Sequence, residues 1–389
     1  MYRPLLSTTL EGPTTATTAN RDLMINRRRL LAMTALAGSA VLLPIRAFAK
    51  PSKPKTPDDW IDWIHDHQQT VALTADNGTD ERLSHRSDQP HLLASTIKVI
   101  HLSAYATAVA EGSLDAREQV RVGDWDAHHP YVSDGGAHHA AYTALGIACD
   151  DYGIAEDPDQ TVDLDSLAAA MIDFSDNAAT DYLRQRLGDP ALHQAAAQGG
   201  WRRPDLRSLQ GEVLQLMFPE YATPDGAPVP RRRRIGDRLA RRFVRDLDFR
   251  AAAKERIATM PATTEEQWPW IRGHGRGTAD ELFGAHRVLA SGDFSPTGAV
   301  SIARRHLERG LAGAVPEGAL GVGFKGGSLP RSLSMGMSVR WKDGRIGTLA
   351  LLLEGVDDFD LAHAGGFVQL GFQALTQPAE YEKLGAALA

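Results

Sequence analysis

Hydrophobic positions follow one another almost without interruption between His91 and Gly112, in the stretch HLLASTIKVIHLSAYATAVAEG. The pattern leaves no polar stripe and therefore predicts a helix enclosed in the protein interior. Lys98 breaks the pattern, three residues after Ser95. On a helix these two side chains share one face, a turn apart. Burying a charged lysine is costly, so the position calls for a chemical explanation.

Patterns typical of strands appear near both ends of the chain. TVALTADNG and ERLSHRSD predict a hairpin turning at Asn77-Gly78, after an amphipathic helix in DDWIDWIHDHQQT. RSLSMGMSVRW and RIGTLALLLEG predict a second hairpin, turning at Lys342-Asp343-Gly344, and FDLAHAGGFVQLGFQALTQ predicts a closing helix. The middle of the chain reads as mostly helical. We therefore expect an α/β (α+β) fold, with one antiparallel sheet built from both termini, flanked by helices, and an inserted all-helical lobe.

The N-terminal segment is not expected to belong to this fold. Arg27 to Arg29 precede an apolar run from Leu30 to Ile45, and Ala47-Phe48-Ala49 is a small-x-small cleavage pattern. These features predict a signal peptide, and the adjacent arginines indicate the twin-arginine route to the periplasm or the exterior. An uncleaved membrane anchor is the alternative. The expected parts are a signal peptide (1–49), a linker (50–57) and a hydrolase domain (58–389) with an α/β lobe at about 58–90 and 290–389 and a helical lobe at about 91–289.

Charge and composition narrow the possible partners. The net charge of −7 argues against general nucleic-acid binding, and the single cysteine, Cys149, excludes an intramolecular disulfide. An arginine-rich stretch from Pro228 to Arg250 is interpreted as a solvated helix face balanced by nearby aspartates, with an anionic-partner surface as the alternative. The aspartates near this arginine-rich stretch are Asp237, Asp246 and Asp248.

We expect a monomer with no stable membrane span after processing and no cofactor.

Histidines gather in the segment DWDAHHPYVSDGGAHHAAY, at His128, His129, His138 and His139. Paired neighbours on a loop point apart, and neither a cysteine nor an i, i+4 spacing joins them. We therefore expect no metal site there.

Three short motifs carry the candidate chemistry. Ser95 and Lys98 supply a nucleophile with an adjacent amine, and burial lowers the pKa of a lysine so that the amine can take the serine proton. Ser-x-x-Lys alone is a weak signal, since a second copy, Ser52 to Lys55, falls in the proline-rich linker. Ser175-Asp176-Asn177 and Lys325-Gly326-Gly327-Ser328 follow later in the chain. Each has a purely structural interpretation, as a helix cap and a turn, but their joint occurrence in this order is specific.

With these three motifs the sequence resembles the serine β-lactamase and penicillin-binding-protein superfamily, in layout most like the class A β-lactamases. LSHRSDQPHLLASTIKVI resembles that family's approach to its nucleophile, and GTADELFGAHRVLASGDFS the helix before its third motif. TVDLDSLAAAMIDFSDNAATDYLRQRLGDP resembles the second motif with its preceding helix. The resemblance covers most of residues 57–389, with interruptions around 125–160 and 220–270.

The resemblance implies a role for each matching residue. Ser95 is the acylated nucleophile, Lys98 its base, and Ser175 the relay of a proton to the departing ring nitrogen. Asn177 holds Lys98 and the amide side chain of the substrate. Lys325 attracts a substrate carboxylate, Gly327 and Ser328 belong to the substrate site, and the backbone N–H groups of Ser95 and Ser328 form the oxyanion hole.

The sequence departs from the family pattern at two positions. Gly326 stands where the third motif usually carries a hydroxyl that helps to bind the substrate carboxylate. The glutamate that activates the deacylating water has no clear motif here. Glu212 falls at about the right distance from Ser175, but the residues after it do not match. Glu212 is therefore the sequence's candidate for the deacylation base, with a structural glutamate as the alternative.

We expect a serine β-lactamase-like hydrolase acting on a β-lactam or related acyl substrate through an acyl-Ser95 intermediate. One alternative is an esterase or D-alanyl-D-alanine carboxypeptidase that uses the same serine. The other is a module that binds or senses β-lactams or peptidoglycan fragments and acylates without turnover.

Overall fold

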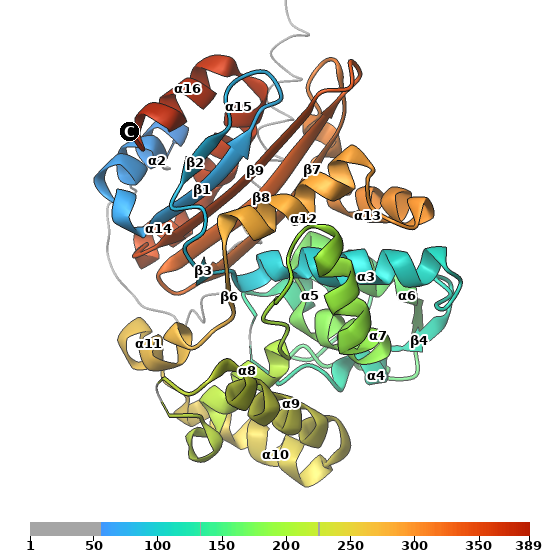
Figure 1. Ribbon diagram of the computed structural model, residues 1–389. Helices are drawn as coiled ribbons and strands as arrows, with labels where there is room; N and C mark the ends of the chain where they lie inside the picture. The colour runs from blue at the N-terminus through green and yellow to red at the C-terminus, as the bar shows by residue number, and fades with distance from the viewer. Residues whose placement is uncertain (1–55, 133, 225) are drawn as a thin grey trace, which may run out of the picture.

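The computed structural model describes residues 56–132, 134–224 and 226–389, so the predicted signal peptide lies outside the described residues (Figure 1). Its centre is a five-stranded antiparallel sheet in the order β2-β1-β9-β8-β7. The strands are β1 (Val71–Asp76), β2 (Leu83–His85), β7 (Ala319–Leu329), β8 (Ser332–Trp341) and β9 (Ile346–Glu354). The expected antiparallel sheet built from both termini is confirmed.

Pairing of β1 with β9 joins the two ends of the chain. Val71 lies opposite Leu353 and Asp76 opposite Thr348. The two hairpins form as the pattern predicts, and Gly344 at the second turn has φ +90°, a conformation that favours glycine. Every residue of β8 from Ser332 to Val339 is buried, so this strand is covered on both faces.

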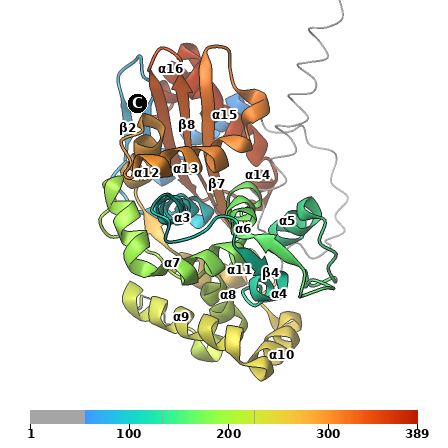
Figure 2. The same ribbon diagram turned by 90° about the vertical axis from the view of Figure 1, so that its right-hand side faces the viewer.

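Helices cover both faces of the sheet, as Figure 2 shows from the side. On one face, Trp60, Phe367 and Met335 belong to a buried apolar cluster between strands and helices. On the other face, α12 (Ala279–Ser291) packs across β8 and β9, and α13 (Thr297–Arg309) lies between β7 and α3 (Lys98–Ala110). The helices that contribute to the cluster around Trp60 and Phe367 are α2 (Pro57–Asp66), α14 (Asp358–Ala362), α15 (Ala364–Thr376) and α16 (Pro378–Ala386).

The remaining helices form the inserted lobe. Two short strand pairs accompany them. β3 (His91–Leu92) pairs with β6 (Arg276–Gly277) where the lobe meets β8 and β9 of the sheet, and β4 (Gln119–Arg121) pairs with β5 (Thr161–Asp163). α12 falls inside the span predicted for the helical lobe, yet it packs on the sheet. The helices are α3 (Lys98–Ala110), α4 (Val122–Asp126), α5 (Ala137–Leu145), α6 (Leu164–Ala169), α7 (Asn177–Gln198), α8 (Leu209–Met217), α9 (Val229–Arg245), α10 (Leu247–Arg256) and α11 (Thr264–Arg272).

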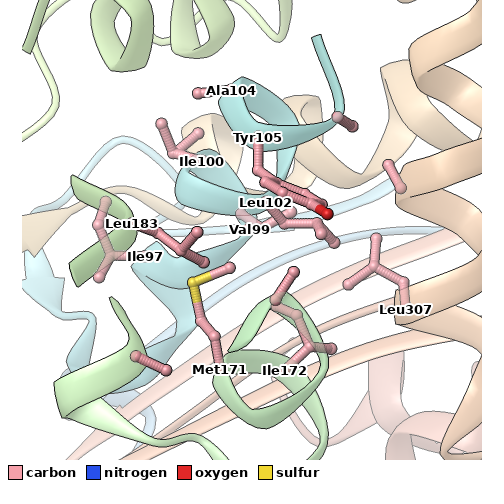
Figure 3. Packing of buried hydrophobic residues seen from close by; sticks show 14 of the residues in the cluster. Ile97, Val99, Ile100, Leu102, Ala104, Tyr105, Met171, Ile172, Leu183 and Leu307 are labelled. Atoms are coloured by element: carbon pink, nitrogen blue, oxygen red, sulfur yellow. The ribbon is translucent and has the colours of Figure 1, made fainter. Parts of the chain in front are cut away.

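The apolar stretch beginning at His91 is buried, as its pattern predicts, but it is not one helix. His91 and Leu92 pair with β6, a 3₁₀ turn follows over Ala94–Ile97, and α3 begins at Lys98. Figure 3 shows its side chains packed among those of Met171, Leu183 and Leu307. Each such aliphatic side chain contributes about 1.5–3 kcal/mol by leaving water.

Among the described residues, no helix combines the length and the apolar character that crossing a membrane would require.

Candidate active site

Ser95 and Lys98 lie at the junction between the 3₁₀ turn and α3. Lys98 Nζ is 3.1 Å from Ser95 Oγ, so the structure brings the predicted nucleophile and base together. Ala94 has φ +47°, a conformation uncommon outside glycine, and the chain turns sharply there before the serine. The Lys98 side chain is 0 % exposed. Burial lowers the pKa of Lys98 to about 8, although the carboxylates of Asp134 and Asp176 oppose this shift.

The second motif surrounds the Lys98 amine with oxygen atoms. Lys98 Nζ donates to the Ser175 carbonyl at 2.5 Å and to Asn177 Oδ1 at 2.7 Å, and lies 3.1 Å from Ser175 Oγ. Ser175 has φ +66° and follows a π-helical turn, Ala170–Phe174. This backbone conformation is costly for a residue with a side chain, and such strain is typical of functional positions.

The third motif lies on the edge strand β7. Lys325 Nζ is 3.1 Å from Ser175 Oγ and 2.8 Å from the carbonyl of Gly326. Burial, together with the neighbouring Lys98, holds the pKa of Lys325 well below its usual value. The side chain is 4 % exposed, so its amine faces Ser175 rather than solvent.

Gly327 permits a close approach between β7 and the 3₁₀ turn Ala94–Ile97 that carries Ser95, called the nucleophile turn below after its predicted role. A Cβ on residue 327 would lie 2.7 Å from Ser95 N and 2.8 Å from the carbonyl oxygen of Leu93. Ser334 Oγ on β8 donates to the same Leu93 carbonyl at 2.7 Å. The backbone around Ser95 is thus held directly against the sheet.

A cavity of about 120 Å³ opens at Ser95. Asn177 and Ser328 line it beside the serine, whereas Ser175, Lys325 and Gly327 line a smaller adjoining cavity. The walls of the larger cavity are mainly apolar and come from α8, α11 and the neighbouring loops. They include Val132, Leu209, Val213, Leu216, Met260 and Trp270. Mainly apolar walls with a few polar groups are typical of sites that bind small molecules.

Glu212 does not join this group. Its side chain is 1 % exposed and does not line the cavity. The carboxylate lies 2.7 Å from an Arg232 nitrogen and 3.2 Å from Arg207, and also accepts from Gln215 Nε2 at 3.1 Å. The geometry therefore does not support the sequence-based candidate, because the Glu212 carboxylate is buried between two guanidinium groups and does not reach the cavity that Ser95 lines.

Two of the four clustered histidines take part in a buried network that the sequence did not indicate. His138 Nδ1 is 2.7 Å from Asp176 Oδ2, and His138 Nε2 is 3.2 Å from Asp126 Oδ1. His129 stacks on His138, and Tyr142 donates to Asp126. Burial alone would lower the pKa of His138, but the two carboxylates raise it to about 10. The charged imidazole fixes Asp176, the middle residue of the second motif, which caps α7 by accepting from Ala179 N.

Gly326 leaves a space that a neighbouring ring occupies. A Cβ on residue 326 would lie 2.9 Å from Phe324 Cζ. A hydroxyl side chain at this position therefore requires the Phe324 ring to move. The absence of a side chain at Gly326 goes together with the position of this ring.

The arginine-rich stretch forms α9, whose outer face is exposed. Asp237 bonds to Arg184 on α7 at 3.0 Å and lies 3.8 Å from Arg233, and Asp246 bonds to Arg242 at 2.9 Å. Two of the expected balancing aspartates thus have arginine partners, and Asp237 also ties α9 to α7. The exposed arginines are Arg231, Arg234, Arg238, Arg241, Arg242 and Arg245.

A family model described as the beta-lactamase enzyme family matches residues 59–259. A beta-lactamase structure from Sphaerobacter thermophilus DSM 20745 superposes with a TM-score of 0.52 at 18% identity, covering 82% of this chain and 97% of that one. A class A beta-lactamase from Mycobacterium abscessus gives a TM-score of 0.48 at 18% identity, with coverage of 81% and 98%. No curated protein matches the sequence. The chain belongs to the beta-lactamase enzyme family and has the β-lactamase fold.

Proposed function

We propose that this protein is a serine hydrolase that opens an amide bond, preferably that of a β-lactam, through an acyl-Ser95 intermediate. The observation that carries the proposal is the continuous set of contacts from Ser95 Oγ through Lys98 Nζ and Ser175 Oγ to Lys325 Nζ, beside a cavity that Ser95 lines. Family membership supports the same reaction class.

Acylation follows from these contacts. Lys98 Nζ, as the neutral amine, accepts the proton of Ser95 Oγ while Oγ forms a bond with the carbonyl carbon of the substrate. The carbon–nitrogen bond then breaks, and the proton passes from Lys98 through Ser175 Oγ to the departing nitrogen. Backbone N–H groups at Ser95 and Ser328 are the proposed donors to the oxyanion, each typically contributing about 2.7–4 kcal/mol.

The test is turnover of a chromogenic cephalosporin by the protein beginning near Lys50. We expect hydrolysis over many cycles and a covalent adduct on Ser95 by mass spectrometry. Ser95→Ala should lose both signals, whereas Ser52→Ala, in the accidental second Ser-x-x-Lys, should keep them. Absence of hydrolysis together with absence of an adduct would refute the proposal.

A second candidate is an esterase or D-alanyl-D-alanine carboxypeptidase using Ser95. Two observations favour it: Phe324 fills the space beside Gly326, and Glu212 lies outside the cavity. Faster turnover of p-nitrophenyl esters or D-alanyl-D-alanine peptides than of the cephalosporin would select it. One-to-one labelling of Ser95 without turnover of any of these substrates would instead select a sensing module.

We also propose export by the twin-arginine route, on the basis of the N-terminal pattern. Arg27→Lys combined with Arg28→Lys should retain the protein in the cytoplasm when fractions of the expressing cells are compared. Unchanged distribution would contradict this route.

A further inference from the structure

Hydrolysis of an acyl-Ser95 intermediate needs a group that activates water near the ester. The α8 residues that line the cavity are Leu209, Gln210, Val213 and Leu216, none of which carries a carboxylate. Among the described residues that line this cavity, the carboxylates are Asp134 and Asp205. Asp205 is occupied by Arg207, whose Nε donates to it at 3.0 Å.

Asp134 lines the cavity together with Pro130 and Val132, its near neighbours in the chain. The carboxylate is anchored rather than loose, because Asp134 Oδ1 accepts a hydrogen bond from the His138 amide at 3.1 Å. His138 is in turn fixed between Asp126 and Asp176. The His-rich insertion therefore places a hydrogen-bonded carboxylate at the wall of the cavity that Ser95 lines.

We propose that Asp134 is the general base that activates water for hydrolysis of the acyl-Ser95 intermediate. This inference rests on the proposed function, since it concerns the second half of the same reaction. It assigns a catalytic task to an insertion that interrupts the family resemblance.

The surroundings of Asp134 make its carboxylate a stronger base than that of an exposed aspartate. Burial raises the pKa of this carboxyl, and the neighbouring Asp176 raises it further, whereas His138 and Lys98 oppose the shift. The interaction between Asp134 and Lys98 also affects the lysine, because Asp134 is the largest of the charges that raise the pKa of Lys98. A carboxylate with a raised pKa removes a proton from water more effectively than an ordinary one.

In the proposed step, Asp134 accepts one proton from a water molecule as the water oxygen bonds to the acyl carbon. The tetrahedral intermediate then collapses by breaking the bond between that carbon and Ser95 Oγ. Asp134 then gives the proton it took from water to Ser95 Oγ. This transfer regenerates the serine hydroxyl, and the product leaves as a carboxylic acid.

The experiment follows decay of the acyl-enzyme, as a first-order rate constant, by quench and intact-protein mass spectrometry with penicillin G. Asp134→Asn keeps an oxygen that accepts from the His138 amide, so the fold should be retained. We expect adduct formation within a few-fold of the unmodified protein, and decay slower by about 100-fold to 10,000-fold. Glu212→Gln is the matched control: it removes the charge of the sequence-based candidate, and the decay constant of the folded fraction should stay within about threefold, because Glu212 lies outside the site.

A pH profile gives a second readout. The decay rate of the unmodified adduct should fall at low pH as Asp134 is protonated, and the decay of the Asp134→Asn adduct should lack this limb. The groups that act on Asp134 are Lys98, His138 and Asp176. The pKa of Lys98 is about 8 and that of His138 about 10, so neither titrates in the acid range. Burial alone would raise the pKa of Asp176, but His138 lowers it below its usual value, so Asp176 is protonated at a lower pH than Asp134, whose pKa is raised.

Equal decay rates for the unmodified and Asp134→Asn adducts would overturn the assignment. If the unmodified protein forms no adduct with penicillin G, a chromogenic cephalosporin or p-nitrophenyl butyrate, the proposed function itself fails and the assignment falls with it. The two failures are distinguishable, because the first requires an adduct and the second its absence.

Discussion

Lys98 and Lys325 approach the same oxygen atom, since each Nζ lies 3.1 Å from Ser175 Oγ. Two ammonium groups in such a buried position would repel each other strongly. The arrangement is stable when at least one amine is neutral, and the lowered pKa values of both lysines agree with this. Ser175 thus connects the proposed base with the strand that closes the site.

The first prediction concerns the pH dependence of acylation. Because the pKa of Lys98 is about 8 in the folded protein, the neutral amine becomes the major form above that pH. The acylation rate should therefore rise with pH and level off above about pH 8, as stopped-flow measurements with a chromogenic cephalosporin will test. Lys98→Met should reduce the rate by about 100-fold to 10,000-fold. Lys342→Met, in an exposed hairpin turn, is the control; a pH-independent rate in the unmodified protein would contradict Lys98 as base.

The second prediction concerns the buried imidazole. His138→Asn leaves Asp126 and Asp176 without their shared cation, and removing one partner of a buried ion pair typically costs about 3–5 kcal/mol. Urea unfolding should show a loss of this size, whereas His65→Asn, at an exposed position of α2, should change stability little. An unchanged unfolding midpoint for His138→Asn would exclude a charged imidazole in this network.

The same network predicts a third result, the direction in which stability changes with pH. The folded pKa of His138, about 10, lies above the ordinary value of 6.5. The folded state therefore holds the proton more tightly, and the contribution of His138 is fully present below pH 6.5. That contribution should decline as pH rises from 6.5 and be lost through about pH 10, where the stabilities of the unmodified and His138→Asn proteins should converge. Parallel stability curves across this window would contradict the prediction.

The fourth prediction concerns Gly327. A methyl group there meets the backbone of Leu93 and Ser95 rather than a movable side chain, so the nucleophile turn must shift. A displacement of about 1 Å commonly costs about 100-fold in rate, and we expect a loss of this order in acylation by Gly327→Ala. Gly347→Ala, on β9, adds a methyl at an ordinary distance of 3.4 Å from Leu375 Cδ2 and should retain the rate. Equal rates for both variants would mean that β7 does not fix Ser95.

The fifth prediction concerns Gly326 and Phe324. Gly326→Ser restores a hydroxyl beside Lys325, and the contact with Phe324 Cζ can be relieved by movement of the end of the ring. A hydrogen bond to a charged group contributes about 1.5–3 kcal/mol, so the KM of a carboxylated β-lactam should fall about tenfold or more. The KM of an uncharged p-nitrophenyl ester should stay the same. Equal changes for both substrates would show that the serine does not contact the carboxylate.

Much of the architecture could be predicted because its determinants are local. The hairpin turning at Lys342-Asp343-Gly344 depends on strand alternation and one glycine, both visible in a short window. The pairing of Ser95 with Lys98 depends on a spacing of three residues, which survives although the chain enters α3 through a 3₁₀ turn. The early start predicted for the helix was wrong because β3 pairs with β6, which lies more than 180 residues away.

The site beyond these motifs was decided by contacts between distant segments. Glu212 and Asp134 are both acidic residues outside the three matching motifs, and counting along the chain favoured Glu212. Only the folded chain gives Glu212 two arginine partners and brings Asp134 to the wall of the Ser95 cavity. The sequence by itself determined that Ser95 and Lys98 lie together and that strands surround them, because short-range spacing and hydrophobic pattern specify those features. Tertiary structure decided which carboxylates line the Ser95 cavity, because burial and ion pairing depend on neighbours that no local pattern records.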